Sequence, residues 1–280
     1  MAASCLRVGR QGAVAQLELD SPANRNALSE VLVRELIEAL AGALADPAVR
    51  VVVIGHRGPA FSSGADLKEQ AAAFRGGDPG PGVAGLVPLF QLMLAADKPL
   101  VCRVGGPARA GGVGLVAACD LAVGSESADF ATGEVRLGVA PAVLSVVVLP
   151  KIGLAAATRL FLTGAVIGAQ EARRVGLLTE VVPDHQLESA LQRTLEQLLL
   201  AEPAALAAAK GILRRVPRLE PEQAFAEMAE LSARLFASPG AQEGMLAFLE
   251  RRSPAWAAPP GAPPGGDGPG QPQPGRPPST

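Results

Sequence analysis

Apolar and polar residues follow regular patterns along the first half of the chain. Residues 13–20, AVAQLELD, alternate between apolar and polar side chains, which is typical of a half-buried strand. The runs RVVVIGH (50–56) and KPLVCRVGG (98–106) are almost continuously apolar, as expected of strands that are buried on both faces. Two shorter runs, DLAVGS (120–125) and ADFAT (128–132), predict further short strands.

Helical periodicity occurs between these strands. One helical face carries the leucines Leu32, Leu36, Leu40 and Leu44. Ser29 stands where an N-cap is expected, and Asp46-Pro47 ends the pattern. PLFQLMLAAD (88–97) predicts a short helix, and a buried helix is expected from about Gly112 to Ala118. The repeated order of strand, loop and helix predicts an α/β fold with largely parallel strands.

Helices dominate the second part of the chain. After one strand in TEVVP (179–183), four helices rich in Ala, Leu and Glu are expected at 186–201, 203–215, 220–237 and 241–252. Their apolar stripes exceed what so short a segment can bury alone, which predicts contacts between subunits. From Ser253 onward Pro and Gly dominate, and such a segment cannot bury enough apolar area to offset its ordering entropy.

We therefore expect three regions: a core at 1–195, a helical region at 196–256 and a disordered tail at 257–280.

Composition narrows the class of protein. The chain has 280 residues, of which 49% are hydrophobic, so it can bury a sizeable core. Its 25 basic and 27 acidic residues give a net charge of -2, and with no Tyr and one Trp it lacks the features of a nucleic-acid surface. Cys5, Cys102 and Cys119 have no metal-ligand spacing and fit a reducing compartment. No stretch has the length of a signal peptide or membrane span, so we expect a cytoplasmic protein with no membrane partner.

Two segments leave buried strands and enter helices through small residues. They are VVVIGHRGPAFSSGAD (51–66) and LVCRVGGPARAGGVG (100–114). A helix N-terminus carries partial positive charge and free N–H groups, so two such ends could direct one backbone N–H each at a single oxygen. The glycines would then let the backbone touch a ligand. The alternative is that small residues serve only tight packing between helix and strand.

Glu134 is the candidate proton-transfer group. It is the only acidic residue between Asp129 and Glu171, in otherwise apolar sequence. A carboxylate in an apolar pocket has a raised pKa and suits proton transfer near neutral pH, although a solvated Glu at a strand end is the alternative. Asp66 and Asp120 are interpreted as structural caps of local backbone.

Several motifs, in this order, resemble the enoyl-CoA hydratase/isomerase (crotonase) superfamily. They are NRNAL (24–28), FSSGADLKE (61–69), RAGGVGLVAACDLAV (109–123), GEVRLGVAPAV (133–143) and LTGAVIGAQEARRVGLLTEVVP (162–183). The resemblance extends from about residue 6 to about residue 252. It implies a spiral of ββα repeats with a C-terminal helical region that builds trimers or hexamers. It also implies an acyl-CoA thioester as substrate and no tightly bound cofactor.

The resemblance assigns roles to individual positions. The amides of Ala65 and Gly111 would stabilise an enolate oxygen, and Glu134 would be the general acid/base. The residues that would contact the CoA moiety are Arg25, Ala27, Ser63 and Asp66, with Arg25 near the phosphates. The segment after Asp66 and the Gly/Pro-rich connection at 75–88 would cover the acyl group.

One position departs from the family pattern. Gly114 stands where two-glutamate hydratases carry their first glutamate, so Glu134 is the only carboxylate of the pair. Hydration of a 2-enoyl-CoA, with a branched or carboxylated acyl group among the options, is the leading interpretation. A 3,2-enoyl-CoA isomerase is the alternative, because one carboxylate can move a proton between two carbons. Thioester hydrolysis, carbon–carbon cleavage and a non-catalytic acyl-CoA-binding subunit are further alternatives.

Overall fold

The computed structural model describes residues 4–76 and 82–257. The chain forms two compact units, Met1–Leu198 and Leu199–Thr280, which we describe separately. The predicted core at 1–195 ends close to the end of the first unit. Of the predicted tail, positions 258–280 lie outside the described residues.

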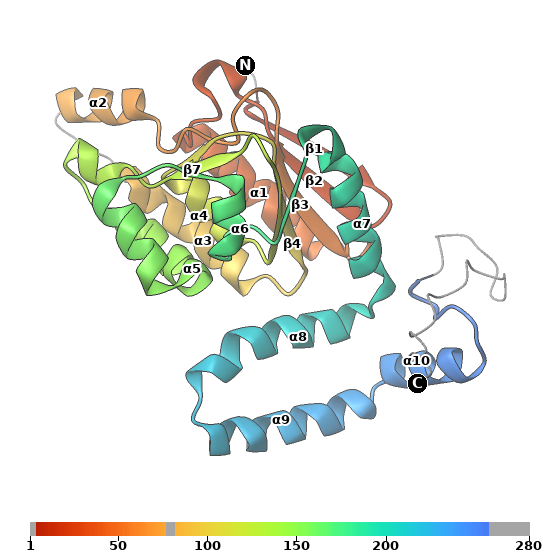
Figure 1. Cartoon of the computed structure of the whole chain (residues 1–280). Helices are drawn as coiled ribbons and strands as arrows, with labels where there is room; N and C mark the ends of the chain where they lie inside the picture. The colour runs from red at the N-terminus through yellow and green to blue at the C-terminus, as the bar shows by residue number, and fades with distance from the viewer. Residues whose placement is uncertain (1–3, 77–81, 258–280) are drawn as a thin grey trace, which may run out of the picture. The chain divides into compact units, whose positions relative to one another are not determined.

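A six-stranded sheet organises the first unit (Figure 1). Its strands, in spatial order, are β1 (Leu6–Gln11), β2 (Val14–Leu19), β3 (Val51–His56), β4 (Leu100–Val104), β6 (Leu121–Ser125) and β9 (Glu180–Val182). Only β1 and β2 pair antiparallel in this sheet, and every later neighbour is parallel. The predicted α/β class with largely parallel strands is therefore confirmed.

A small second sheet lies beside the first. It contains β5 (Ala108–Arg109), β7 (Asp129–Ala131) and β8 (Ile167–Gly168), in the order β5-β7-β8. β5 runs parallel to β7, with Ala108 opposite Phe130. This pairing brings the segment that precedes the predicted glycine helix next to the segment that precedes Glu134.

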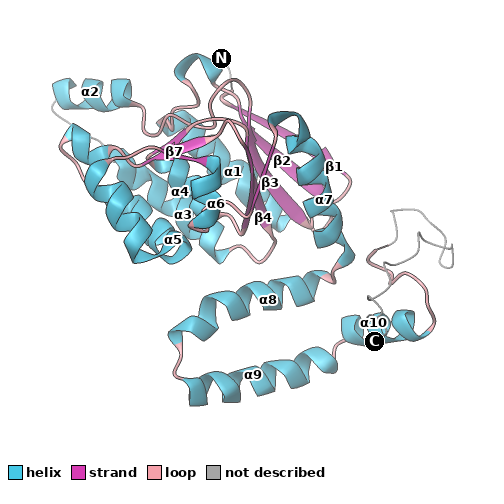
Figure 2. Ribbon diagram, in the orientation of Figure 1, coloured by secondary structure: helices cyan, strands magenta, loops and turns pink. Residues whose placement is uncertain are grey.

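Helices cover both faces of the large sheet (Figure 2). On one face, α1 (Glu30–Ala45), α3 (Val87–Ala95) and α4 (Gly111–Ala118) share a continuous apolar core with strand residues such as Ile54 and Cys102. On the other face, α7 (Leu187–Leu200) packs its Leu187 against Val123 of β6. The sheet is therefore the middle layer, as expected when parallel strands are buried on both sides.

Polar groups close both ends of α1. The Ser29 hydroxyl accepts a hydrogen bond from Leu32 N at 3.2 Å, as the sequence predicts. At the other end, Lys98 Nζ donates to the carbonyl oxygens of Ala43 (3.0 Å) and Asp46 (2.6 Å). These contacts satisfy terminal backbone groups that a helix leaves unpaired.

The remaining elements of the first unit are short, apart from one long helix. They are η1 (Pro22–Asn24), α2 (Leu67–Gly76), η2 (Gly82–Leu86), η3 (Glu134–Leu137), α5 (Ala142–Thr163), α6 (Ala169–Arg174) and η4 (Asp184–Gln186). The Gly/Pro-rich connection at 75–88 contains the end of α2, the turn η2 and the start of α3, while 77–81 lie outside the described residues. Leu86 in this stretch is buried.

Among the described helices, α5 alone has the length and apolar composition of a membrane span. Its backbone is not continuously helical, because Gly153 has φ 75° and ψ 166° and follows Pro150. Leu144, Val147 and Val148 on its inner face belong to the apolar core. We therefore assign α5 to the core of the first unit.

The second unit is helical, as predicted. It contains α8 (Pro203–Arg215), η5 (Val216–Arg218), α9 (Pro221–Phe236) and α10 (Pro239–Leu249). Trp256 Nε1 donates to Leu200 O at 3.0 Å and ties the end of the unit to its start. Large apolar side chains remain exposed in the single chain, among them Leu213, Phe225, Phe236, Phe248 and Leu249. Subunit contacts through these faces stay a prediction.

Candidate active site

The structure brings the two predicted strand-to-helix loops together. Ser62 and Ala108 form a parallel bridge, and Arg109 N donates to Ser62 O at 2.9 Å. Gly64 is one point of close approach: a Cβ placed there would lie 2.9 Å from Ala110 Cβ. Its φ of +86° also favours glycine. The predicted donors, Ala65 and Gly111, each follow this contact by one residue.

The direction of the Ala65 amide is fixed by its own peptide plane. The Gly64 carbonyl oxygen accepts a hydrogen bond from Leu28 N at 2.7 Å. Because a trans peptide is planar, the Ala65 N–H must point opposite to that carbonyl. Within the described part of the chain, no hydrogen bond from the Ala65 amide is found.

The Gly111 amide is directed in the same way by the start of α4. Ala110 O accepts from Val113 N (2.9 Å) and Gly114 N (3.2 Å), so the carbonyl points along the helix and the Gly111 N–H points out of its N-terminus. Ala110 has φ 47° and ψ −116°, a sparsely populated conformation for a non-glycine residue that costs on the order of 1–3 kcal/mol. Among the described residues the Gly111 amide also has no hydrogen-bond partner.

Glu134 lies at the start of η3, close to this helix mouth. Ala131 O accepts a hydrogen bond from Ala110 N, the residue before α4, at 2.9 Å. Glu134 follows Ala131 by three residues, and three residues of chain span at most roughly 10 Å. Glu134 Oε2 is buried and has no hydrogen-bond partner among the described protein atoms. Burial therefore raises the pKa of this carboxyl group, which suits proton transfer.

The glycines at the start of α4 serve different purposes. At Gly112 an added Cβ would lie 2.8 Å from Ser62 Cβ, so this glycine allows the first loop to approach the helix. At Gly114 an added Cβ would lie 2.6 Å from Phe90 Cζ and 3.2 Å from Leu144 Cβ. The Phe90 ring therefore occupies the space into which a side chain at Gly114 would point.

Of the residues expected to contact CoA, Arg25 and Ala27 differ in their exposure. Arg25 is exposed and has a left-handed backbone conformation, with φ 56°. Ala27 is buried, and its amide contacts the Asn24 side-chain oxygen at 3.3 Å.

The side chains of Ser63 and Asp66 both form hydrogen bonds with main-chain groups of the protein. Ser63 Oγ donates to Asn24 O at 3.1 Å, and Ser63 N donates to Arg25 O at 2.9 Å. Asp66 Oδ1 accepts from Lys68 N at 2.9 Å and caps α2, so its structural interpretation is confirmed. The structural interpretation of Asp120 is also confirmed, although its partner is not local: Asp120 Oδ2 accepts from Leu100 N of β4, 20 positions away, at 2.7 Å.

Sequence reasoning missed two buried polar residues next to the site, Asn26 and Ser62. Both are fully buried, and their side chains bond across loops that are more than 30 positions apart in sequence. The only local signal was polar side chains flanked by small and apolar residues in NRNAL and FSSGAD.

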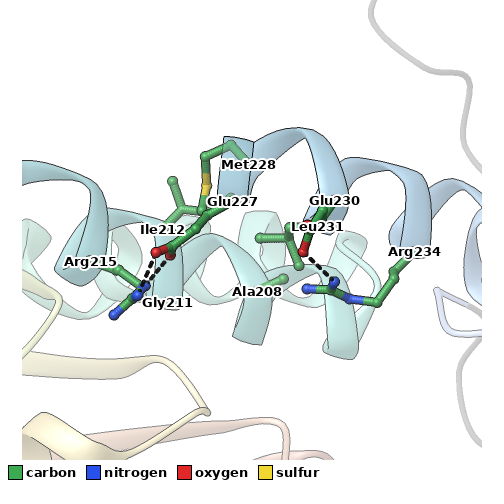
Figure 3. A pocket seen from close by; sticks show the side chains of 9 residues that line it. All are labelled: Ala208, Gly211, Ile212, Arg215, Glu227, Met228, Glu230, Leu231 and Arg234. Atoms are coloured by element: carbon green, nitrogen blue, oxygen red, sulfur yellow. Dashed lines mark hydrogen bonds and ion pairs between the residues drawn. The ribbon is translucent and has the colours of Figure 1, made fainter. Parts of the chain in front are cut away.

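Two surface hollows lie elsewhere in the molecule. Figure 3 shows a groove of about 460 Å³ in the second unit, lined by Ala208, Gly211, Ile212, Arg215, Glu227, Met228, Glu230, Leu231 and Arg234. Arg215 and Glu227 pair across it, with 2.7 Å between Nη2 and Oε1. A second hollow of about 350 Å³ lies between α5 and α6, and includes Arg159 and Glu171. Their charged groups are largely paired with one another, so we place the site at the helix mouths.

Known proteins are similar to this chain over nearly its whole length. The sequence model of the enoyl-CoA hydratase/isomerase family matches residues 9–259. The 2,3-dehydroadipyl-CoA hydratase of Escherichia coli K12 is 35% identical over 254 residues, which cover 89% of this chain and 97% of that protein. The carnitinyl-CoA dehydratase of the same strain is 35% identical over 262 residues, covering 90% and 97%.

A solved enoyl-CoA hydratase/isomerase from Marinobacter aquaeolei has a TM-score of 0.86 with 31% identity, over 91% of this chain and all of that one. The α/β core with its helical C-terminal region is therefore the crotonase fold, as the resemblance implies. The chain belongs to the enoyl-CoA hydratase/isomerase family.

Proposed function

We propose that this protein adds water to a 2-enoyl-CoA thioester. The observation that carries the proposal is the pair of backbone amides at Ala65 and Gly111, which have no partner among the described residues and whose directions are set by their peptide planes. Such donors stabilise a negative charge that develops on the thioester oxygen. The names of the relatives, a hydratase and a dehydratase, support hydration as the reaction.

Glu134 supplies the proton transfers. Its carboxylate accepts a proton from water while the water oxygen bonds to C3 of the acyl chain. The electron pair of the C2–C3 double bond forms the C1–C2 double bond, the carbonyl π pair moves to the thioester oxygen, and the resulting enolate accepts hydrogen bonds from the two amides. Glu134 then returns the proton to C2, which restores the carbonyl group. Because burial raises the pKa of Glu134, the acid limb of the rate profile should lie above the ordinary range of a glutamate.

Arg25 is the proposed contact for the CoA phosphates. Its side chain is exposed at the edge of the first loop and forms no ion pair within the described residues. A guanidinium group binds phosphate oxygens through charge-assisted hydrogen bonds. The acyl-CoA remains a substrate in this proposal.

A 3,2-enoyl-CoA isomerase is the second candidate. The observation that favours it is the Phe90 ring, which occupies the space beside Gly114 and leaves Glu134 as the single acidic group proposed at the site. One carboxylate can remove a proton from C2 of a 3-enoyl thioester and return it to C4, with the same two amides on the enolate oxygen. This reaction needs no bound water.

A panel of CoA esters separates these activities. Hydration of 2-enoyl-CoAs lowers the absorbance of the conjugated thioester and adds the mass of one water. Isomerisation of 3-enoyl-CoAs raises that absorbance with no change of mass. We expect the first result with at least one linear, branched or carboxylated 2-enoyl-CoA. Tight binding of every ester without turnover would indicate a non-catalytic acyl-CoA-binding protein and contradict the proposal.

A further inference from the structure

Asn26 is the centre of a buried hydrogen-bond network under the first loop. Its side-chain Nδ2 donates to the carbonyl oxygens of Arg57 (3.0 Å) and Ala60 (2.8 Å). Its Oδ1 accepts from Ser21 N at 2.7 Å. The side chain is fully buried and every one of its bonds fixes main chain. Such a fully satisfied network in a low-dielectric interior specifies one geometry.

Ser62 connects this network to the amide of the first loop. Its hydroxyl donates to Asn26 O at 2.8 Å and accepts from Gly64 N at 3.2 Å. Gly64 O is bound by Leu28 N at 2.7 Å, so both polar groups of Gly64 are fixed. The next peptide plane contains the Ala65 N–H: Leu28 fixes its carbonyl oxygen, and Ser62 fixes the peptide plane immediately before it.

Ser62 also connects to the second loop. Its carbonyl oxygen accepts from Arg109 N at 2.9 Å, two residues before Gly111. Its Cβ would lie 2.8 Å from a Cβ added at Gly112, so the first turn of α4 packs directly on this serine. One buried residue thus touches the supports of both amides.

We infer that Asn26 and Ser62 are positioning residues that set the distance and angle between the Ala65 and Gly111 amides. This inference rests on the proposed function, because it assumes that both amides bind the thioester oxygen. Neither residue contacts the acyl group in this role. Their loss displaces donors whose effect depends on geometry within a fraction of an ångström, and a misplacement of about 1 Å can cost roughly 10² in rate.

Two substitutions remove the network in different ways. Ser62→Ala deletes the hydroxyl that links Asn26 O to Gly64 N and adds no volume. We expect kcat to fall about tenfold while KM changes less than about threefold. Asn26→Asp keeps the shape but replaces the Nδ2 donor with an oxygen that faces two carbonyl oxygens. Its kcat should fall further, by about 10².

The matched control is Ser29→Ala. Ser29 is also a buried serine, and its hydroxyl accepts one hydrogen bond, from Leu32 N, which caps α1 and does not reach either amide. We expect it to lower the melting temperature as much as Ser62→Ala does, with kcat unchanged. A general loss of stability therefore cannot account for a difference between the two serine variants.

The experiment combines kinetics with a spectroscopic probe. An arylacryloyl-CoA bound to the unaltered protein should absorb at longer wavelength than in water, because the amides polarise its carbonyl group. Ser62→Ala and Asn26→Asp should reduce this red shift, and Ser29→Ala should keep it. A red shift and kcat that are unchanged in folded Ser62→Ala overturn the inference. So does a Ser62→Ala chain that fails to fold, or one that changes only KM. Absence of both turnover and red shift in the unaltered protein overturns the proposed function itself.

Discussion

The two connections that deliver the site's amides are built differently. The connection after β3, residues 57–66, is held by buried polar side chains, with Asn26 and Ser62 bonding its main chain. The connection after β4, residues 105–110, relies on close packing: a Cβ added at Gly106 would lie 2.5 Å from Pro59 O. Buried side-chain hydrogen bonds thus hold the main chain of the first connection, whereas the second combines main-chain hydrogen bonds, such as Ala110 N to Ala131 O, with the missing side-chain volume at Gly106.

The largest effect is expected from added volume at Gly114, in the helix α4 into which the second connection leads. Gly114→Glu would place Cβ 2.6 Å from Phe90 Cζ, inside a helix whose residues are all buried. Overpacking costs about 1–3 kcal/mol, and a buried unpaired carboxylate costs several more. This sum approaches a domain's whole stability of roughly 5–15 kcal/mol, so we expect little folded protein.

Denaturant unfolding of Gly114→Glu and Gly114→Ala checks this steric account. The alanine variant should fold and lose about 1–3 kcal/mol. Shortening Phe90 to Ala in the Gly114→Glu background should recover part of the folded fraction. A Gly114→Glu chain as stable as the unaltered one would show that Phe90 does not fill this space in solution.

Glu134 belongs to neither connection. As the proposed acid/base it acts on a substrate bound by both amides, so its loss should lower activity without disturbing either connection. Glu134→Gln keeps the size of the side chain and removes the carboxylate that transfers the proton. We expect kcat to fall by about 10²–10⁴ with the fold intact. Stability should stay equal or rise slightly, because the buried Oε2 has no protein partner among the described residues. Steady-state kinetics and thermal unfolding test both points, and a variant with near-normal kcat would exclude Glu134 as the acid/base.

Gly111→Pro tests the amide of the second connection. Proline has no N–H, and its φ suits the first position of a helix. A Cβ at this position also approaches Leu28 Cδ1 and Leu86 Cδ1 at 2.8 and 2.9 Å, so Gly111→Ala is the control that keeps the amide. We expect the Pro variant to have a kcat about 10²–10³ below that of the Ala variant. Equal kcat values in the two variants would make Gly111 a packing residue only.

His56, at the end of β3, binds Gly105 at the start of the second connection. We expect its titration to lower the stability of the fold at acidic pH. Its Nε2 accepts a hydrogen bond from Gly105 N at 2.9 Å, and the ring is buried against Phe61. Burial, with help from the Arg103 charge, lowers the pKa of His56 to about 4. Between pH of about 6.5 and 4 the unfolded chain binds a proton that the folded chain does not, so stability should fall by up to roughly 3 kcal/mol as pH decreases.

Unfolding free energies at pH 7 and pH 4.5 measure this contribution. His56→Asn should lose stability at pH 7 and show a smaller decrease between the two values than the unaltered protein. The carboxylates titrate in both proteins, so the difference between them isolates His56. Equal decreases would mean that His56 keeps an ordinary pKa.

Local patterns were sufficient to predict most elements of the fold. The buried β3 and β4 are continuous apolar runs, and α1 has both its leucine stripe and its Ser29 cap. The α5 helix is hidden in the sequence because Pro150 and Gly153 resemble helix breakers. The two-residue strands β5 and β8 are set by their pairing with β7, which no local pattern reveals.

Residues of the candidate site were predictable where their immediate sequence neighbours mark them out. Glu134 stands out as a single acid in apolar sequence, and the glycines identify the helix mouth. Asn26 and Ser62 bond to partners more than 30 positions away, so their roles depend on tertiary contacts. The same holds for Gly114, whose neighbour Phe90 comes from a different helix.

Isotope-edited infrared spectroscopy of a bound acyl-CoA tests the central claim most directly. A ¹³C label at the thioester carbonyl separates its stretching band from the protein amide bands. If the Ala65 and Gly111 amides bind this oxygen, the band should move to lower frequency on binding, and less so in Gly111→Pro than in Gly111→Ala. A band that stays at its frequency in water when the unaltered protein is saturated with ligand would contradict the account.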